Sequence, residues 1–192
     1  MLITICDEYA SKNEIVYNSK KSVCMAILPR SLQKHNVPTM YLQKKSLNWV
    51  KEHKYLGIYI CNNFRDDRDV KRQMRAIYYR GNSLINKFRH CSVEVKTQLF
   101  KSFCSNMYCS PLWSCYSKEV YRKLKVAYNN IFRNFMSVNR MQSTSQLQNF
   151  YGIDSFNVLI RKNIVNFRNR LLSSKNGLIQ ACLLVIFIFI GV

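Results

Sequence analysis

The sequence predicts an α+β fold, with short antiparallel strands near the start followed by a mainly α-helical bundle. Two patterns lead to this prediction. Segments rich in β-branched and aromatic residues, separated by polar turns, occur before residue 62. Beyond that point apolar residues recur every three or four positions, as in helices that pack on one face. We therefore expect a strand-rich part at 1–62, a helical domain at 63–176 and an apolar tail at 177–192.

The size and composition of the chain are sufficient for a packed core. The chain has 192 residues, of which 48% are hydrophobic and 13% aromatic. A chain of this length buries well over half of the surface that its unfolded form exposes. Composition therefore argues against disorder.

The strand-rich part is expected to begin with a helix and a first pair of strands. Apolar residues at helical spacing predict a helix over residues 2–12. The β-prone segments 15–17 and 23–27 flank a polar turn at Asn18, which predicts a hairpin or two neighbouring strands. A second hairpin is expected within 44–60, hinged near Glu52, with Leu56 in the core.

The first long helix is expected to begin near Asp69 and to have one apolar and one cationic face. Its apolar stripe consists of Val70, Met74, Ile77, Gly81, Leu84, Ile85 and Phe88. Its opposite face carries Arg68, Lys71, Arg72, Arg75, Asn82 and Asn86.

Further helices follow. Ser92 is a plausible cap for a helix that ends near Pro111. The next helix, from Lys118 to about Phe135, repeats the plan of the first, so the two cationic faces are expected to flank one groove. Its inward residues are Val120, Leu124, Ala127, Ile131 and Phe135, and its outward residues are Arg122, Lys125, Asn129 and Arg133. Later helices are expected to begin at residues 143–145 and 154–155.

The net charge points to a polyanionic partner. Thirty Lys and Arg residues stand against ten Asp and Glu residues, a formal charge of +20. Self-repulsion on this scale destabilises a compact chain unless counter-charges are near. Nucleic acid is the first candidate and an anionic membrane the second, and a merely basic soluble surface is the remaining alternative.

Two groups of possible metal ligands are better explained without a metal. The eight cysteines form no Cys-x-x-Cys pair, so we expect buried thiols in a reducing compartment. Asp66, Asp67 and Asp69 stand at a helix start, where carboxylates cap free amides and offset the helix dipole. We assign no metal to either group.

The ends of the chain bear on location. No secretory signal is visible at the start, and we expect an intracellular protein of the nucleus or cytoplasm. The apolar run from Ala181 is shorter than the about 20 helical residues that a bilayer core requires. We expect a buried helix there, or translation past the end of a domain, and no membrane partner.

Two short motifs carry a resemblance to a known family. Asn18-Ser19-Lys20-Lys21-Ser22 resembles the Asn-x-x-Lys-Ser/Thr signature of LINE-type reverse transcriptases, which non-long-terminal-repeat retrotransposons encode. Lys54-Tyr55-Leu56-Gly57-Ile58 resembles the hairpin that grips the primer end in the same family. The helices that follow are similar to the thumb of these polymerases, so the resemblance runs from about residue 2 to 176.

The resemblance implies that the chain is the C-terminal palm edge and thumb of an RNA-directed DNA polymerase. The expected partners are an RNA template/DNA primer duplex and the remainder of the polymerase. In the family, aspartates on two earlier palm strands hold two metal ions for nucleotidyl transfer. Nothing before Asn13 resembles those strands, so we expect binding without polymerisation. No cofactor is expected in this chain, and magnesium only in an intact parent.

The predicted nucleic-acid-binding residues come from three places. Lys21 matches a lysine that lies near the triphosphate in the family, although it equally fits a solvated turn lysine. Tyr55, Leu56 and Gly57 match the primer grip, and their alternative is an ordinary strand. The cationic helix faces are expected to contact phosphates through Arg68, Lys71, Arg72, Arg75, Arg122, Lys125 and Arg133.

Two other functions remain open at this stage. The chain contains enough basic surface for a non-catalytic RNA- or DNA-binding module, with no link to a polymerase. It could also be a membrane-associated basic protein that uses its apolar tail.

Overall fold

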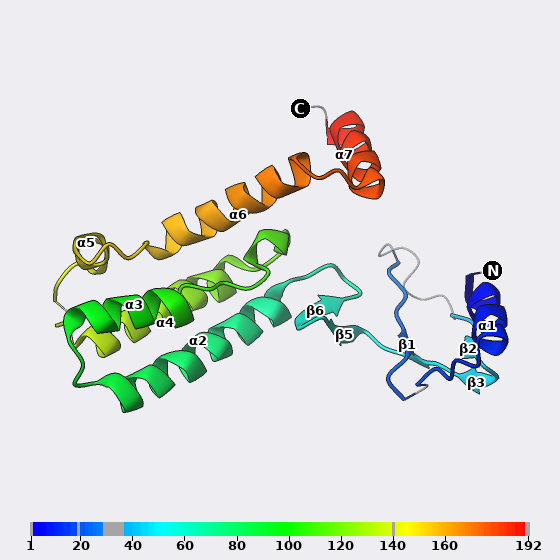
Figure 1. Cartoon of the computed structure of the whole chain (residues 1–192), viewed down its shortest axis with the longest axis horizontal. Coiled ribbons are helices and arrows are strands. Elements are labelled where there is room, and N and C mark those ends of the chain that lie inside the picture. The colour runs from blue at the N-terminus through cyan, green and yellow to red at the C-terminus, as the bar shows by residue number, and fades with distance from the viewer. Residues whose placement is uncertain (1, 19, 29–36, 140, 191–192) are drawn as a thin grey trace. The chain divides into compact units, whose positions relative to one another are not determined.

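The computed structural model describes residues 2–18, 20–28, 37–139 and 141–190. The chain forms two compact units, Met1–Asp69 and Val70–Val192, and the division falls after Asp69 rather than after residue 62. Seven α-helices and a few short strands account for 56% and 9% of the structure, which confirms the predicted α+β class (Figure 1).

The first unit begins with the predicted helix, but its first strand pairs differently from the prediction. Helix α1 spans Leu2–Lys12. Strand β1 (Val23–Cys24) pairs in parallel with β4 (Asn48–Trp49), and segment 15–17 forms no strand. The hairpin predicted around Asn18 is therefore wrong.

A glutamine side chain explains why segment 15–17 stays out of the sheet. The Gln43 amide oxygen accepts the backbone N–H of Tyr17 at 2.9 Å, and its amide nitrogen donates to the carbonyl of Ile15 at 2.6 Å. The backbone N–H of Gln43 donates to the Asp7 carboxylate at 2.9 Å. One turn residue thereby ties helix α1 to the segment that follows it.

Gln43 lies in the first of two hairpins in this unit. Strands β2 (Tyr41–Leu42) and β3 (Lys45–Ser46) are antiparallel and are joined by Gln43 and Lys44. Both joining residues have positive φ, at 48° and 62°. Two positive φ values in a two-residue loop are typical of a type I′ turn, whose twist matches that of the strands.

The second hairpin is present as predicted, but its turn lies elsewhere. Strand β5 (Glu52–Tyr55) pairs antiparallel with β6 (Ile58–Cys61), so Leu56 and Gly57 form the turn and Glu52 pairs with Cys61. The φ values of Leu56 and Gly57 are 46° and 86°, again typical of type I′. Leu56 is 74% exposed, so its predicted place in the core is wrong.

Replacing Leu56 by asparagine should stabilise this hairpin. Leucine in the left-handed region carries a steric cost of about 1 kcal/mol that asparagine largely avoids. We expect Leu56→Asn to raise the free energy of unfolding, measured by urea denaturation, by about that amount. Leu178→Asn is the matched control, since Leu178 is equally exposed but helical, and it should give no gain. A loss at Leu56 would show that its side chain stabilises the folded state.

The second unit is a helical bundle in which the chain runs back and forth. Helix α2 spans Asp67–Phe88, α3 spans Val93–Phe103 and α4 spans Lys118–Met136. In Figure 1, α3 runs against α2, and α4 runs in the same direction as α2. A 3₁₀ turn at Ser110–Leu112 interrupts the connection between α3 and α4. The remaining helices are α5 (Thr144–Phe150), α6 (Phe156–Leu172) and α7 (Gly177–Ile190).

Serine caps fix two of these helix starts. Ser92 accepts the N–H of Val95 at 3.5 Å, as predicted, and Ser117 accepts the N–H of Val120 at 3.3 Å. Helix α3 ends at Phe103, however, well before Pro111, and Met107 reaches the core from the following loop. Among the described helices, none is both long and apolar enough to cross a membrane.

The predicted apolar stripes of α2 and α4 do form the core. Phe100 of α3 packs edge-on against Tyr128 and Phe132 of α4, with ring centroids 5.3 and 5.5 Å apart. The fully or nearly fully buried residues from the two stripes are Val70, Ile77, Leu84, Leu124, Ala127, Ile131 and Phe135. The helical periodicity of the sequence was sufficient to identify them.

Gly81 allows α2 and α4 to approach closely. A Cβ atom built on Gly81 would lie 2.8 Å from Cδ1 of Ile131 and closer still to its Cγ2. Ile131 is buried in the core and cannot turn away. The glycine is therefore a packing requirement of this helix pair.

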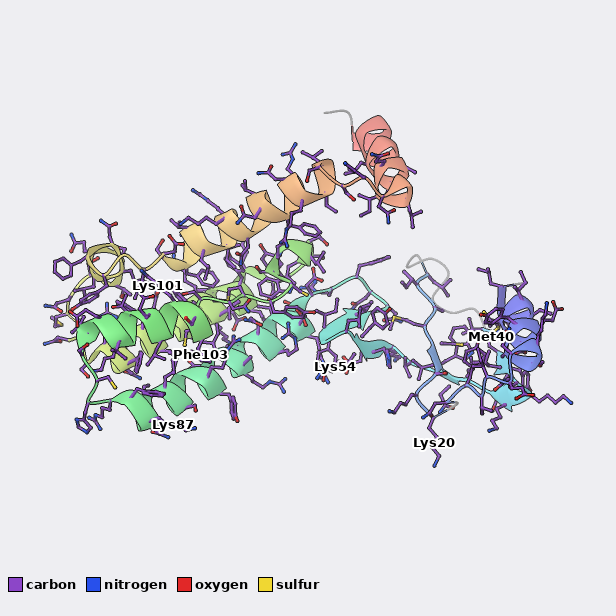
Figure 2. The ribbon with its side chains drawn as sticks, viewed as in Figure 1. Lys20, Met40, Lys54, Lys87, Lys101 and Phe103 are labelled. Carbon is purple, nitrogen blue, oxygen red and sulfur yellow. The ribbon has the colours of Figure 1, made fainter. Side chains whose placement is uncertain are left out.

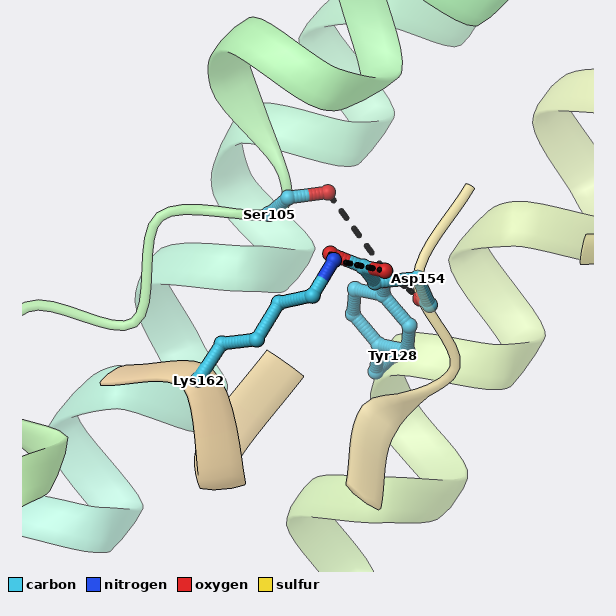
Figure 3. A network of polar contacts seen from close by, with 4 residues as sticks. All are labelled: Ser105, Tyr128, Asp154 and Lys162. Atoms are coloured by element: carbon cyan, nitrogen blue, oxygen red, sulfur yellow. Dashed lines mark hydrogen bonds and ion pairs between the residues drawn. The ribbon is translucent and has the colours of Figure 1, made fainter. Parts of the chain in front are cut away.

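Tyr128 links the core to the start of α6 (Figure 3). Its hydroxyl donates to the backbone carbonyl of Asp154 at 2.8 Å and lies 3.4 Å from the hydroxyl of Ser105. The carboxylate of Asp154 accepts from Nζ of Lys162 at 2.7 Å. Burial raises the pKa of the Tyr128 phenol above its ordinary value.

Tyr128→Phe should destabilise the protein at neutral pH and matter less at high pH. The variant leaves the Asp154 carbonyl without this donor, at a cost of about 1 to 3 kcal/mol. Because the folded pKa is raised, the wild-type advantage persists below the ordinary tyrosine pKa of about 10 and declines above it. Urea denaturation between pH 7 and 11 should show the two stability curves converging. Tyr79→Phe, at an exposed position, should show no difference at any pH.

Candidate nucleic-acid interface

The motif at 18–22 is a tight turn organised by Asn18. The side-chain oxygen of Asn18 accepts the N–H groups of Lys20 and Lys21 at 3.1 and 3.2 Å. Its backbone carbonyl accepts the N–H of Ser22 at 3.0 Å and the hydroxyl of Ser22 at 3.0 Å. Both lysines are exposed, and Figure 2 shows Lys20 extending away from the ribbon. The asparagine thus holds a turn that presents two ammonium groups.

The tip of the second hairpin presents apolar and aromatic groups to solvent. Tyr55, Leu56 and Gly57 are all exposed, and so is Lys54 beside them. A backbone turn with glycine at its second position leaves room for another chain to approach. The tip is therefore open to solvent, and Lys54 adds a positive charge to it.

Contacts with the first residues of α2 fix the base of that hairpin. Asp69 is 2% exposed, and its carboxylate accepts the backbone N–H of Tyr59 at 3.1 Å. The guanidinium of Arg68 lies 3.0 Å from the Glu52 carboxylate and 4.7 Å from the centre of the Tyr59 ring. Asp69 therefore does more than cap a helix, and Arg68 already has two partners in the hairpin.

The cations that follow on α2 have different surroundings. Lys71 and Arg75 are exposed. Arg72 is half-buried, its guanidinium lies 6.0 Å from the centre of the Tyr108 ring, and it donates to the Gln73 side chain at 3.4 Å. Lys71 and Arg75 are thus better placed than Arg72 to meet phosphates.

The cations predicted on α4 also separate into two kinds. Arg122 is exposed and Lys125 is half-buried. Arg133 donates to the carbonyls of Asn139 and Gln142 at 2.8 and 2.6 Å, so it holds the loop that follows the helix. Periodicity placed all three on the outer face, but it could not distinguish a solvated guanidinium from one that closes a loop.

One carboxylate of α4 is influenced by cations of both helices. Glu119 of α4 forms a 2.6 Å ion pair with Lys123. A hydrogen bond from Lys123 and its charge, followed by the charges of Arg122 and Lys71, hold the pKa of Glu119 below its ordinary value. Because Lys71 lies on α2 and the others on α4, cations of both helices contribute to the electrostatic potential at this carboxylate.

Lys123 was absent from the predicted site. Lys123 lies one helical turn after Glu119, a spacing typical of an ion pair within a helix. This spacing predicts a structural role for Lys123 rather than a role in binding. Lys123 is exposed on α4 next to Arg122, so we add it to the candidate residues. A sequence signal that could have identified Lys123 is the number of cations within one helical turn of each acidic residue. The nearest partner of each acidic residue alone does not identify it.

A polar hollow lies between α2 and α4. Its volume is about 570 Å³, and its lining consists of Tyr78, Asn130, Arg133, Asn134 and Val138. Of the predicted cations on these two faces, the lining of the hollow contains Arg133, so a groove flanked by both cationic faces stays a prediction. Among the described residues no cluster of three or more His, Cys, Asp or Glu side chains is placed to hold a metal ion.

The arrangement is suited to binding an extended anion. Exposed Lys and Arg side chains on two neighbouring helices can follow a phosphate backbone without reading its sequence. No protein-family model, curated protein or solved structure matches the chain. The features that bear on function are therefore this geometry and the motifs at 18–22 and 54–58.

Proposed function

We propose that this chain binds an RNA template/DNA primer duplex, as the palm edge and thumb of a LINE-type reverse transcriptase. The observation that carries the proposal is that Lys71 and Arg75 of α2 and Arg122 and Lys123 of α4 are exposed on two helices that approach closely at Gly81 and Ile131. The net charge of +20 and the two short motifs support the same partner.

In this proposal the helices α2 and α4 follow the phosphates of the duplex. Lys71 and Arg75 of α2 and Arg122 of α4 make the main contacts, because these three are exposed. Each phosphate that is neutralised releases condensed counterions, so binding becomes steeply salt-dependent. The contacts position the duplex and leave sequence recognition to base pairing.

The first unit would contribute to the primer side. Tyr55, Leu56 and Gly57 at the hairpin tip would approach the sugar-phosphate chain of the primer, and Lys21 would face a triphosphate. Nucleotide addition itself belongs to aspartates and magnesium ions of a complete polymerase. Alone, this chain is expected to bind and not to polymerise.

A binding titration tests the proposal. The full chain is measured against an RNA/DNA hybrid, each single strand, and anionic phospholipid vesicles, at several salt concentrations. We expect the tightest binding to the hybrid and a steep dependence of affinity on salt. Preference for vesicles that disappears on deletion of residues 177–192 would contradict the proposal and favour membrane association.

A second arm separates a polymerase part from a general nucleic-acid-binding module. The chain is mixed with duplex DNA and duplex RNA of the same length as the hybrid. A part of a reverse transcriptase should favour the hybrid, whereas a module that follows phosphates alone should bind all three duplexes with similar affinity.

A further inference from the structure

The hollow between α2 and α4 has features of a binding site for a flat, polar ring. Its volume of about 570 Å³ lies within the range of small-ligand pockets. One wall comes from α2 through Tyr78, and the other comes from α4 and from Val138 in the segment that follows it. Both walls belong to the same compact unit and to its packed helices.

The polar groups of the hollow are available to a ligand. Asn130 and Asn134 stand one helical turn apart on α4, are exposed, and make no side-chain hydrogen bond within the described part of the chain. Tyr78 is 38% exposed, and its hydroxyl likewise has no partner among the described residues. Two carboxamides and one aromatic ring therefore face the same space.

The lining also includes one fixed positive charge. Two N–H groups of Arg133 donate to backbone carbonyls, which hold the guanidinium in place, and three further N–H groups remain. Arg75, one turn before Tyr78 on α2, is exposed. A ring that enters the hollow can thus carry a phosphate on either side.

From these groups we infer that the hollow takes one unpaired nucleobase, with adenine preferred, from a strand bound along α2 and α4. An aromatic ring stacks on an unpaired base, and a carboxamide offers the donor and acceptor that match the edge of adenine. A paired base would not fit, because its edge is engaged and its faces are covered by neighbours. This inference rests on the proposed function and adds a single-strand site to it.

The test compares hybrids that differ only at one end. One hybrid is blunt, and the others carry a short single-stranded overhang of adenines, of uracils or of abasic sites. We expect the full chain to bind the adenine overhang about tenfold more tightly than the abasic one, as stacking of a single base provides. A fluorescent 2-aminopurine in the overhang should lose intensity when it stacks on Tyr78.

Matched variants locate the effect. Tyr78→Leu and Asn134→Ala should each remove most of the adenine preference and leave the affinity for the blunt hybrid unchanged. Tyr79→Leu and Asn82→Ala are the controls, since Tyr79 is 79% exposed and both lie on α2 outside the hollow. These two should keep the full preference. Asn134 is exposed, so its variant reports on the site even where Tyr78→Leu impairs folding.

The outcomes separate the inference from the proposed function. Equal affinity for adenine and abasic overhangs, with tight binding of the blunt hybrid, overturns the nucleobase site and leaves the proposed function standing. Loss of the preference in the control variants as well also overturns it. Failure to bind any hybrid overturns both.

Discussion

Removing three exposed cations from α2 and α4 is expected to weaken hybrid binding about 100-fold at low salt. The triple variant is Lys71→Gln, Arg75→Gln and Arg122→Gln, which removes three charges and keeps polar side chains of similar helix propensity. Each lost contact between unit charges in water is worth about 1 kcal/mol, which gives about 3 kcal/mol for the three. The logarithmic salt slope should fall by about 2.7, at about 0.9 for each phosphate.

The control variant loses the same net charge as the triple variant, but from α6 rather than from α2 and α4. Arg161→Gln, Arg168→Gln and Arg170→Gln remove three cations from exposed positions of α6. This variant should bind with a slope within about one unit of the wild type, because long-range attraction alone is screened at moderate salt. Equal losses in the two variants would show that total charge rather than the α2 and α4 faces determines binding.

Gly81→Ala should destabilise the second unit by about 1 to 3 kcal/mol, the usual cost of overpacking a core. In an exposed helix the same change would be favourable by about 1 kcal/mol, because alanine is the better helix former. Here the new methyl group would overlap Ile131, which has no free space to move into. Urea denaturation followed by circular dichroism measures the difference.

Two further variants test the cause of that loss. Gly177→Ala meets nothing within 4 Å and should be neutral or slightly stabilising. Ile131→Ala removes the atoms that Gly81→Ala would strike, so the double variant should lose clearly less stability than the sum of the two single variants. Simple additivity would locate the defect of Gly81→Ala elsewhere than at Ile131.

Periodicity predicted the helical unit well because its helices bury one face each. The stripes on α2 and α4 are the buried stripes of the structure, and the caps at Ser92 and Ser117 are local interactions that a short segment determines by itself. The predicted end of α3 was wrong, because the prediction assumed that the helix continues as far as the next proline. Met107 is buried although it lies in a loop, so the expected burial of an apolar residue does not show whether it belongs to a helix or to a loop.

The strand-rich unit was harder to predict because distant residues determine its pairing. The partner of β1 lies at Asn48–Trp49, and the backbone of segment 15–17 is satisfied by Gln43, a residue whose side chain gives no local signal. The turn at Leu56 was missed since leucine is uncommon at positive φ.

The candidate site was predicted in part. The sequence placed these cations on helix faces opposite the buried stripes, but their partners depend on residues far along the chain. Arg68 turned out to contact the hairpin, Arg72 the Tyr108 ring and Arg133 the loop after α4. Their assignment to nucleic acid stays a prediction, and the polar hollow beside Tyr78 could not be located from periodicity alone.

Glu119 serves as an internal counter-ion for the surface on which it stands. A carboxylate carries the same sign of charge as a phosphate, and Glu119 already pairs with Lys123 at 2.6 Å. If the proposed function holds, an arriving strand has to compete with this resident anion for the charge of Lys123.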